Sequence, residues 1–369
     1  MTVPFLSLAD QVRELRPQLD AAMGRVLDSG WFLLGKELDA FEGEFAAYVQ
    51  AKHGVGVANG LDALHLALKA CGIGPGDEVI VPSNTYIATW LAVSQVGAVP
   101  VPVEPDSSTC NLDAARIAAA ITPRTRAVMP VHLYGQACDM DAILAVTRPR
   151  GLRVIEDAAQ CHGARWRGKR IGAHGDAVAW SFYPTKNLGA LADGGAVTTD
   201  DAQLADRIRV LRNYGQRERY VCEVQGLNSR LEELQAAVLR VKLAHLDAWN
   251  ARRAVIAARY LRELAGLPGL VLPVVAAGAE TVWHLFTVRH VRRDALKAAL
   301  LAAGVQTIVH YPIPPHRQQA YAGLGLAAGS LPIAEAIHRE VLSLPIGPHL
   351  SDADISTVIA ALRQALQSS

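Results

Sequence analysis

Two short segments in the middle of the chain carry side chains that could act on one ligand. VIEDAAQ (154–160) contains Asp157 and Gln160, and AWSFYPTKN (179–187) contains Ser181 and Lys186. If each segment begins as a strand of one parallel sheet, the strand ends share a rim and all four side chains can face the same ligand. An amine nucleophile, a carboxylate, an amide and a hydroxyl together suit a cofactor that carries an aldehyde on a phosphorylated pyridine ring.

Lys186 is the residue on which that chemistry depends. It is the only lysine between Lys169 and Lys242, and it lies in a turn rich in Pro, Asn and Gly with Tyr183 three residues before it. Burial beside a cationic ring would lower the pKa of its amine, which would leave it neutral enough to attack a carbonyl and to move protons. A solvated surface lysine is the ordinary alternative, because lysine is usually exposed.

The neighbours of Lys186 also have structural alternatives. Asp157 would keep the ring nitrogen protonated, or it would cap a strand end or a turn, while Gln160 would contact the phenolic oxygen of the ring. His162 could pack beside the ring or serve as a buried structural histidine. Tyr86, in SNTYIAT (83–89), could stack on the ring face or pack in the core.

A phosphate site is predicted where a strand leads through a glycine into a helix. In NGLDALHLAL (59–68) the leucines recur at helical spacing, so a helix should begin near Gly60, Leu61 and Asp62. Free backbone N–H groups and the helix dipole favour an anion there, and Ser181 would add a hydroxyl donor from another strand.

The residues between about 55 and 200 predict the framework that holds this cluster. Short apolar segments bounded by Gly, Pro or Asp alternate with segments of helical period, which is typical of parallel βαβ units. The expected strands are 54–58, 78–81, 99–101, 127–130, 153–155, 178–182 and 195–198. Further helices are expected near 85–96, 113–120 and 139–147.

The pattern changes after residue 200 to long helical stretches rich in Ala, Leu and Arg. Residues 231–265 predict a helical spine that joins two lobes, and strand-like segments at 281–288 and 307–309 alternate with helices. We therefore expect a large domain over residues 1–245 and a small α+β domain over residues 246–369.

The composition is that of a globular protein with no charge signal for a polyanionic partner. Among 369 residues, 36 Lys and Arg balance 35 Asp and Glu, for a net charge of +1. Nucleic acid and anionic membrane are thus disfavoured as partners. Five cysteines lack CxxC spacing, which favours a reducing cytoplasm, and no metal site is expected. We expect neither an export signal nor a membrane span, because no basic stretch leads into an apolar run.

Six ordered blocks of the chain resemble the DegT/DnrJ/EryC1/StrS family of nucleotide-sugar aminotransferases. They are NGLDAL (59–64), SNTYIAT, EDAAQCHGA (156–164), SFYPTKNLGALADGGA (181–196), RNYGQ (212–216) and GLNSRLEELQAAVL (226–239). The likeness runs from VPFLSL (3–8) to VHYPIPPH (309–316) and so covers nearly the whole chain.

The resemblance implies an α/β fold of the aspartate aminotransferase type (fold type I), with a large, mostly parallel seven-stranded sheet domain and a small C-terminal domain. It implies a homodimer with shared sites and pyridoxal 5'-phosphate joined to Lys186 as an imine. Asp157 would then face the ring nitrogen and Gln160 the phenolic oxygen. The phosphate would be held by Gly60, Leu61, Asp62, Ser181 and, from the neighbouring subunit, Asn228. Asn228 could instead belong to a helix cap, because Ser229 and Glu232 have the spacing of a capping box.

The block around the lysine resembles the branch of the family that aminates 3-keto sugars, whereas SFHPxKN is similar to the 4-keto branch. Tyr183 therefore points to carbon three, His310 and Tyr311 look like further substrate contacts, and His316 is a weaker candidate. The implied reaction transfers the amino group of glutamate to a nucleotide-linked 3-keto-6-deoxyhexose, with a dTDP-sugar expected. A 4-keto-sugar aminotransferase and a cofactor-binding regulator without turnover are the alternatives.

Further details of the sequence qualify the resemblance. Ala192 stands where many relatives carry glycine, which should be tolerated if its φ stays negative. Related dehydratases carry histidine in place of Lys186, so dehydration is disfavoured. Candidate ligands of the substrate diphosphate are Arg212, Arg217, Arg219 and Arg230.

Overall fold

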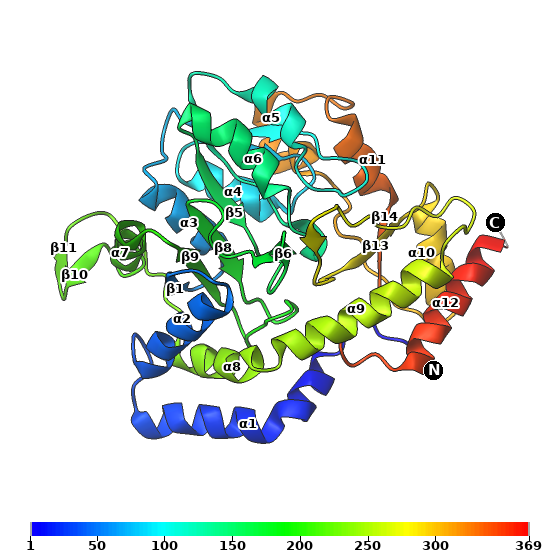
Figure 1. Ribbon diagram of the computed structural model, residues 1–369, viewed down its shortest axis with the longest axis horizontal. Helices are drawn as coiled ribbons and strands as arrows, with labels where there is room; N and C mark the ends of the chain where they lie inside the picture. Colours follow the sequence, from blue (N-terminus) through cyan, green and yellow to red (C-terminus); the bar gives the residue numbers. More distant parts are fainter. Residues whose placement is uncertain (1, 368–369) are drawn as a thin grey trace.

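The computed structural model describes residues 2–367 and has a central seven-stranded sheet between two layers of helices (Figure 1). The strand order is β1-β9-β8-β5-β4-β2-β3, and β9 runs antiparallel to both of its neighbours. The strands are β1 (His53–Val57), β2 (Glu78–Pro82), β3 (Val99–Val103), β4 (Thr125–Val128), β5 (Arg153–Asp157), β8 (Ala177–Ser181) and β9 (Gly195–Thr199). All seven predicted strands are present, and the mostly parallel sheet of the expected fold class is confirmed.

Alternating side chains of the strands build a core on each face of the sheet. In β2, Ile80 belongs to one core, whereas Val79 and Val81 belong to the other. Val154 and Ile155 of β5 divide in the same way. These strands are apolar on both faces because helices cover both, as expected where helical crossovers join parallel strands.

Helices complete both cores and confirm the helices predicted between residues 55 and 200. The core that contains Ile80 is covered by α2 (Lys36–Tyr48), α5 (Ala114–Ala120), α6 (Met140–Thr147) and α8 (Glu233–Leu243). The core that contains Val79 is covered by α3 (Gly60–Ala70), α4 (Ile87–Gln95) and α7 (Ala202–Leu211). The N-terminal helix α1 (Leu8–Ser29) packs along α8. Among residues 2–367, no helix is both long and apolar enough to cross a membrane.

The strand ends that were expected to carry the chemistry meet at one edge of the sheet. β5 ends at Asp157 and its neighbour β8 ends at Ser181, while β9 begins beside them at Gly195. The backbones approach closely here, since a Cβ on Gly195 would lie 2.4 Å from the carbonyl oxygen of Asn59. Glycine at this position lets the turn that opens α3 come up against the ends of β8 and β9.

The residues after α8 form a second, smaller core. It contains α9 (Leu246–Glu263), α10 (Arg293–Ala302), α12 (Asp352–Gln367) and the antiparallel pair β13 (Phe286–Arg289) and β14 (Val341–Leu344), with α11 (Pro332–Glu340) leading into β14. The short strands are β6 (Arg165–Trp166), β7 (Lys169–Arg170), β10 (Gln216–Glu218), β11 (Val221–Cys222) and β12 (Ala279–Glu280). The β10–β11 hairpin stands away from the body of the molecule (Figure 1).

The C-terminal half differs from the predictions at three places. The helical spine predicted at 231–265 is present but divided into two helices, because α8 ends at Leu243 and α9 begins at Leu246 after a tight turn in which the His245 N–H donates to the Lys242 carbonyl. The segment 307–309 does not form a strand: Ile308 makes a single bridge to Ser343 before the chain turns toward the sheet edge. The strand expected at 281–288 is shorter and begins only at Phe286.

One segment from each part of the chain packs in the core of the other part. Val3 belongs to the smaller core, and Tyr321 packs edge-on against Trp90 of α4, with 5.1 Å between ring centroids. The Tyr321 hydroxyl also shares a 3.1 Å hydrogen bond with Ser94. We propose that the domain boundary lies near Leu246, where α9 begins, and that these two segments cross it.

The aromatic cluster between α2 and the sheet provides a test of this packing. Phe45 is 1% exposed and makes edge contacts of 5.2 Å between ring centroids with both Trp180 and Phe182. Phe45→Ala should lower the free energy of unfolding by about 3–5 kcal/mol, because the cavity left behind loses these contacts. Denaturant unfolding followed by circular dichroism measures it. The control Val255→Ala, at a side chain that is 60% exposed, should cost under about 0.5 kcal/mol. Equal stability of the two variants would contradict this core.

Candidate active site

A pocket of about 510 Å³ opens at the rim where β5 and β8 end. It is lined by residues from the start of α3, the start of α4, the two strand ends and the loop that follows residue 309. Ten residues singled out in the sequence line it: Gly60, Leu61, Tyr86, Asp157, Gln160, Ser181, Tyr183, Lys186, His310 and Tyr311. The fold therefore brings most of the predicted cluster into one cavity.

Lys186 is half-buried in this pocket and lies in a closed turn. Its backbone N–H donates to the Tyr183 carbonyl at 2.8 Å. Lys242, buried in α8, donates to the carbonyl of Gly189 at 2.7 Å and so ties the far side of the turn to the helix layer. The solvated-lysine alternative does not hold, because the turn directs Lys186 into the cavity.

The pocket favours the neutral form of the Lys186 amine. Desolvation lowers its pKa to about 8, although the negative charge of Asp157 opposes the change. Burial also lowers the pKa of His310 to about 4 and that of His284 well below its usual range. The amine is thus much closer to neutrality at physiological pH than an ordinary lysine, and the two histidines beside it are uncharged.

Asp157 is buried at the inner end of the pocket, with 6% of its surface exposed. The Thr89 hydroxyl donates to Oδ2 at 2.8 Å, and the Ala159 N–H donates to Oδ1 at 3.1 Å. Burial raises the pKa of the Asp157 carboxyl, while these two donors and the charge of Lys186 act in the opposite direction. A carboxylate has about four lone-pair positions, so Asp157 can accept one further N–H from a ligand in the cavity.

The backbone of Asp157 is held from the neighbouring strand segment. Its N–H donates to the Pro130 carbonyl at 2.8 Å, and its carbonyl accepts from the His132 N–H at 3.0 Å. On the opposite side of the strand, Glu156 accepts from His132 Nε2 at 3.0 Å and from the Gly175 N–H at 2.6 Å. The Cys138 N–H donates to His132 Nδ1, so the ring proton must lie on Nε2.

The amide of Gln160 is oriented by two tyrosines. Its Oε1 accepts from the Tyr134 N–H at 2.7 Å, and its Nε2 donates to the Tyr311 hydroxyl at 3.0 Å. One amide N–H is left to donate into the pocket.

Tyr86 is 52% exposed and its ring centroid lies 5.0 Å from that of Tyr311, so the core-packing alternative for Tyr86 is wrong.

The start of α3 forms a cradle against the end of β8. A Cβ on Gly60 would lie 2.6 Å from Cβ of Ser181, so only glycine fits beside that serine. Asn59 caps the helix by accepting the Asp62 N–H at 2.8 Å, which leaves the Gly60 and Leu61 N–H groups for an anion. An anion cradle, a buried carboxylate and a lysine with a lowered pKa in one cavity fit a phosphorylated pyridine aldehyde. Within residues 2–367, no group of three or more His, Cys, Asp or Glu side chains is placed to hold a metal ion.

Several predicted contacts do not line this pocket. Asp62 lies outside it, with its N–H already used by the Asn59 cap. Asn228 is exposed and pairs with Asn213. The capping-box alternative for Asn228 is wrong, because Ser229 accepts from the Ala58 N–H and α8 begins only at Glu233.

The weaker candidates lie elsewhere in the same chain. His316 is buried and bonded to Glu335 at 3.1 Å. Arg212 is buried against Glu42, and the other three proposed diphosphate ligands, Arg217, Arg219 and Arg230, lie outside the pocket. Ala192 does not have a positive φ, so its replacement of glycine is accommodated as expected.

His162 is a structural residue in this fold. It is fully buried, and its ring lies 5.3 Å from that of Trp180 and 5.7 Å from that of Phe182, measured between ring centroids. Burial lowers the pKa of His162 to about 3, so the ring is neutral. It supports the end of β8 from behind and does not line the pocket.

Five polar residues at the pocket were not found by sequence reasoning: Thr85, Thr185, Asp193 and His284 line it, and Thr89 lies behind Asp157. Thr85 and Thr89 lie four residues apart inside SNTYIAT, and helical spacing could have indicated that they share a face. His284 follows Trp283 in an apolar segment with no local signal. Its Nδ1 shares a 3.1 Å hydrogen bond with the amide oxygen of Asn187, a contact between residues far apart in sequence.

A mostly parallel seven-stranded sheet with a lysine and a carboxylate at its rim defines an enzyme of the aspartate aminotransferase fold class. The chain belongs to the DegT/DnrJ/EryC1/StrS aminotransferase family, whose sequence pattern matches residues 14–363. The family and the transaminase class predicted from the motifs are thereby confirmed.

Relatives of known name match this chain over almost its full length. A dTDP-3-amino-3,4,6-trideoxy-alpha-D-glucose transaminase of Streptomyces venezuelae is 59% identical and covers 98% of this chain and 96% of its own length. The erythromycin biosynthesis sensory transduction protein EryC1 of Saccharopolyspora erythraea is 58% identical, with 98% and 99% covered. A dTDP-3-amino-3,6-dideoxy-alpha-D-galactopyranose transaminase of Aneurinibacillus thermoaerophilus is 52% identical, with 98% and 99% covered.

A solved structure shows the same fold. The crystal structure of S. venezuelae DesV in complex with a ketimine intermediate has a TM-score of 0.97 to this chain at 59% identity, with 98% of each chain covered.

The lowered pKa of Lys186 predicts how the attachment of pyridoxal phosphate to the cofactor-free protein depends on pH. Below about pH 8 the amine is protonated and cannot attack, so the rate should rise about tenfold per pH unit and level off above pH 8. Stopped-flow absorbance measures this rate. A midpoint near the ordinary lysine value of about 10.4 would contradict the desolvation of Lys186.

Proposed function

We propose that this chain is a pyridoxal 5'-phosphate-dependent aminotransferase that transfers the amino group of glutamate to carbon three of a nucleotide-linked 3-keto-6-deoxyhexose. The product would be a 3-amino-3,6-dideoxyhexose nucleotide, with dTDP as the expected nucleotide. The observation that carries the proposal is a pocket that holds a lysine with a pKa lowered to about 8 together with a buried carboxylate. The 59% and 52% identities to two dTDP-3-amino-sugar transaminases support the sugar class.

The pocket residues divide the work of such a transfer. When bound, the cofactor ring supplies an electron sink for the carbon atom next to the transferred nitrogen. Asp157 would hold the proton of the ring nitrogen, Gln160 would donate to the phenolic oxygen, and Ser181 with the start of α3 would hold the phosphate. Lys186 Nζ would take the proton from the α carbon of glutamate and return one to carbon three of the sugar.

Side chains at the mouth of the pocket would meet the sugar. Tyr183 is 52% exposed beside Lys186. The Tyr311 hydroxyl accepts from Gln160 and so keeps its own proton for a ligand. His310 lines the pocket, and its Nδ1 is bonded to the Ser343 hydroxyl at 2.8 Å, so Nε2 is the ring nitrogen that could meet a ligand.

The carbon that is aminated can be tested with paired substrates. The purified protein, glutamate and a dTDP-linked 3-keto or 4-keto 6-deoxyhexose should yield amine only from the 3-keto compound, with product identified by mass and NMR. The Lys186→Ala protein serves as the control and should give no amine from either. Amination of the 4-keto compound alone would show that the chain belongs to the alternative branch, in which Tyr183 lies differently against the hexose.

A regulator without turnover is the second candidate, because a 58% identical relative is named a sensory transduction protein. A lysine with a lowered pKa at a pocket with an anion cradle favours turnover over sensing. Loss of the visible absorbance of the lysine-bound cofactor on addition of glutamate would support the enzyme. A spectrum that glutamate leaves unchanged, with no 2-oxoglutarate formed, would favour the regulator.

We further propose a homodimer in the cytoplasm with active sites shared between subunits. Large apolar side chains are exposed near the start of α2, where Trp31 is 63% and Phe32 is 49% exposed, and on the β10–β11 hairpin, where Tyr220 is 82% exposed. Such surfaces favour a protein partner. All five cysteines are free, which agrees with a reducing compartment.

Site sharing predicts the behaviour of mixed dimers. Asn228→Ala should weaken pyridoxal phosphate binding by about tenfold, because a hydrogen bond to the charged phosphate is lost. In a mixed dimer of one Asn228→Ala subunit and one Lys186→Ala subunit, one of the two sites combines the intact Lys186 of the first subunit with the intact Asn228 of the second. Refolding the two variants together should therefore restore wild-type cofactor affinity and up to half of the activity. If Asn228 acts within its own subunit, the mixture will recover neither.

A further inference from the structure

Two threonine hydroxyls lie behind the carboxylate of Asp157. Thr89 Oγ1 is 2.8 Å from Asp157 Oδ2, and Thr85 Oγ1 is 2.9 Å from Thr89 Oγ1. Thr89 is fully buried and Thr85 is 2% exposed, so bulk water does not compete with either contact. Both belong to the segment that opens α4, a different element from the strand that carries Asp157.

The protons in this chain of contacts can run in one direction only. An ionised carboxylate has no proton to give, so Thr89 must donate to Asp157. A hydroxyl has one proton, and Thr89 has used it, so Thr85 must donate to Thr89. The result is a polarised relay whose negative end is Asp157, and a donor chain of this kind strengthens each link.

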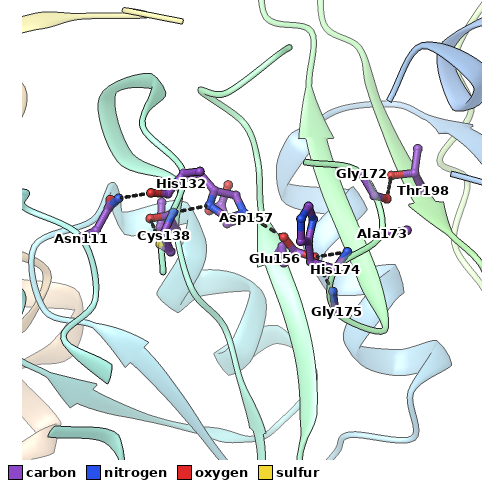
Figure 2. A network of polar contacts seen from close by, with 12 residues as sticks. Asn111, His132, Cys138, Glu156, Asp157, Gly172, Ala173, His174, Gly175 and Thr198 are labelled. Carbon is purple, nitrogen blue, oxygen red and sulfur yellow. Dashed lines mark hydrogen bonds and ion pairs between the residues drawn. The ribbon is translucent and has the colours of Figure 1, made fainter. Parts of the chain in front are cut away.

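Other groups also face Asp157, and they act on it differently. Lys186 comes from the turn after β8, His132 from the segment after β4, Cys161 from the turn after β5 and Tyr311 from the loop of the small unit. Lys186 is expected to change its charge when it joins the cofactor. The His132 ring is already bonded to Glu156 on the other side of the strand (Figure 2). Thr89 is thus the side chain that stabilises the Asp157 anion through a direct hydrogen bond.

We propose that Thr89, oriented by Thr85, is a positioning residue that keeps Asp157 ionised and turns its remaining lone pairs toward the pocket. This inference rests on the proposed function, in which Asp157 faces a protonated ring nitrogen. Removal of the donor would make the carboxylate easier to protonate, and a protonated Asp157 no longer pairs with a cationic ring. Cofactor affinity should therefore fail at a higher pH.

The test is the affinity of the cofactor-free protein for pyridoxal phosphate as a function of pH. Thr89→Val keeps the side-chain shape but removes the donor, and should move the midpoint of the acid limb up by about one pH unit, the size expected for one hydrogen bond to a charge. Thr89→Ser restores the hydroxyl and should restore the midpoint. Thr147→Val removes a buried hydroxyl bonded to the Ile143 carbonyl in α6 and should leave the midpoint unchanged.

The outcomes separate this inference from the proposed function. A wild-type protein that fails to attach pyridoxal phosphate at Lys186 overturns the function itself, before any variant is made. A Thr89→Val protein that binds the cofactor with the wild-type midpoint overturns only the role of Thr89, even if its affinity falls equally at all pH values. If Thr89→Val does not fold, Thr85→Val decides the matter: an upward move of about half a pH unit supports the relay, and an unmoved midpoint overturns it.

Discussion

The constraint on which this structure depends is a buried carboxylate that must stay charged beside an amine that must lose its proton easily. Desolvation raises the pKa of Asp157 and lowers the pKa of Lys186 to about 8, so the cavity that suits the amine works against the acid. The protein resolves the conflict with donors directed only at Asp157, namely the Thr89 hydroxyl and the Ala159 N–H. Each donor stabilises the anion without adding a second positive charge near Lys186.

Close backbone approach is the second requirement of the site. The start of α3 can serve as an anion cradle only if it touches the end of β8, and Gly60 and Gly195 permit this because a Cβ at either position would collide with its neighbours. The helix dipole then stabilises the anion at short range. Among the residues that line the pocket, Lys186 is the one lysine or arginine, so the cradle itself holds the anion without a cationic side chain.

The small C-terminal unit completes the cavity through hydrogen bonds to the large one. Gln160 donates to Tyr311, and the Tyr134 hydroxyl donates to the His310 carbonyl at 2.7 Å, so the residues after 309 are held across the pocket from Lys186. Because Gln160 also accepts from the Tyr134 N–H, one amide links the large-domain turn to the small-unit loop. The contacts that orient Gln160, a proposed cofactor ligand, therefore also place Tyr311 and His310, which are proposed to meet the sugar.

The sequence by itself determined the seven strands, the family and most of the pocket, because apolar strands end at Asp157 and Ser181 and a glycine opens α3. Those signals are local: each depends on residues within a few positions of one another. Only the tertiary structure decided that Thr89 bonds to Asp157 and that His284 lines the pocket. These features arise from contacts between segments tens of residues apart, where a hydroxyl or an imidazole finds its partner only after the sheet, the helices and the small unit have packed together.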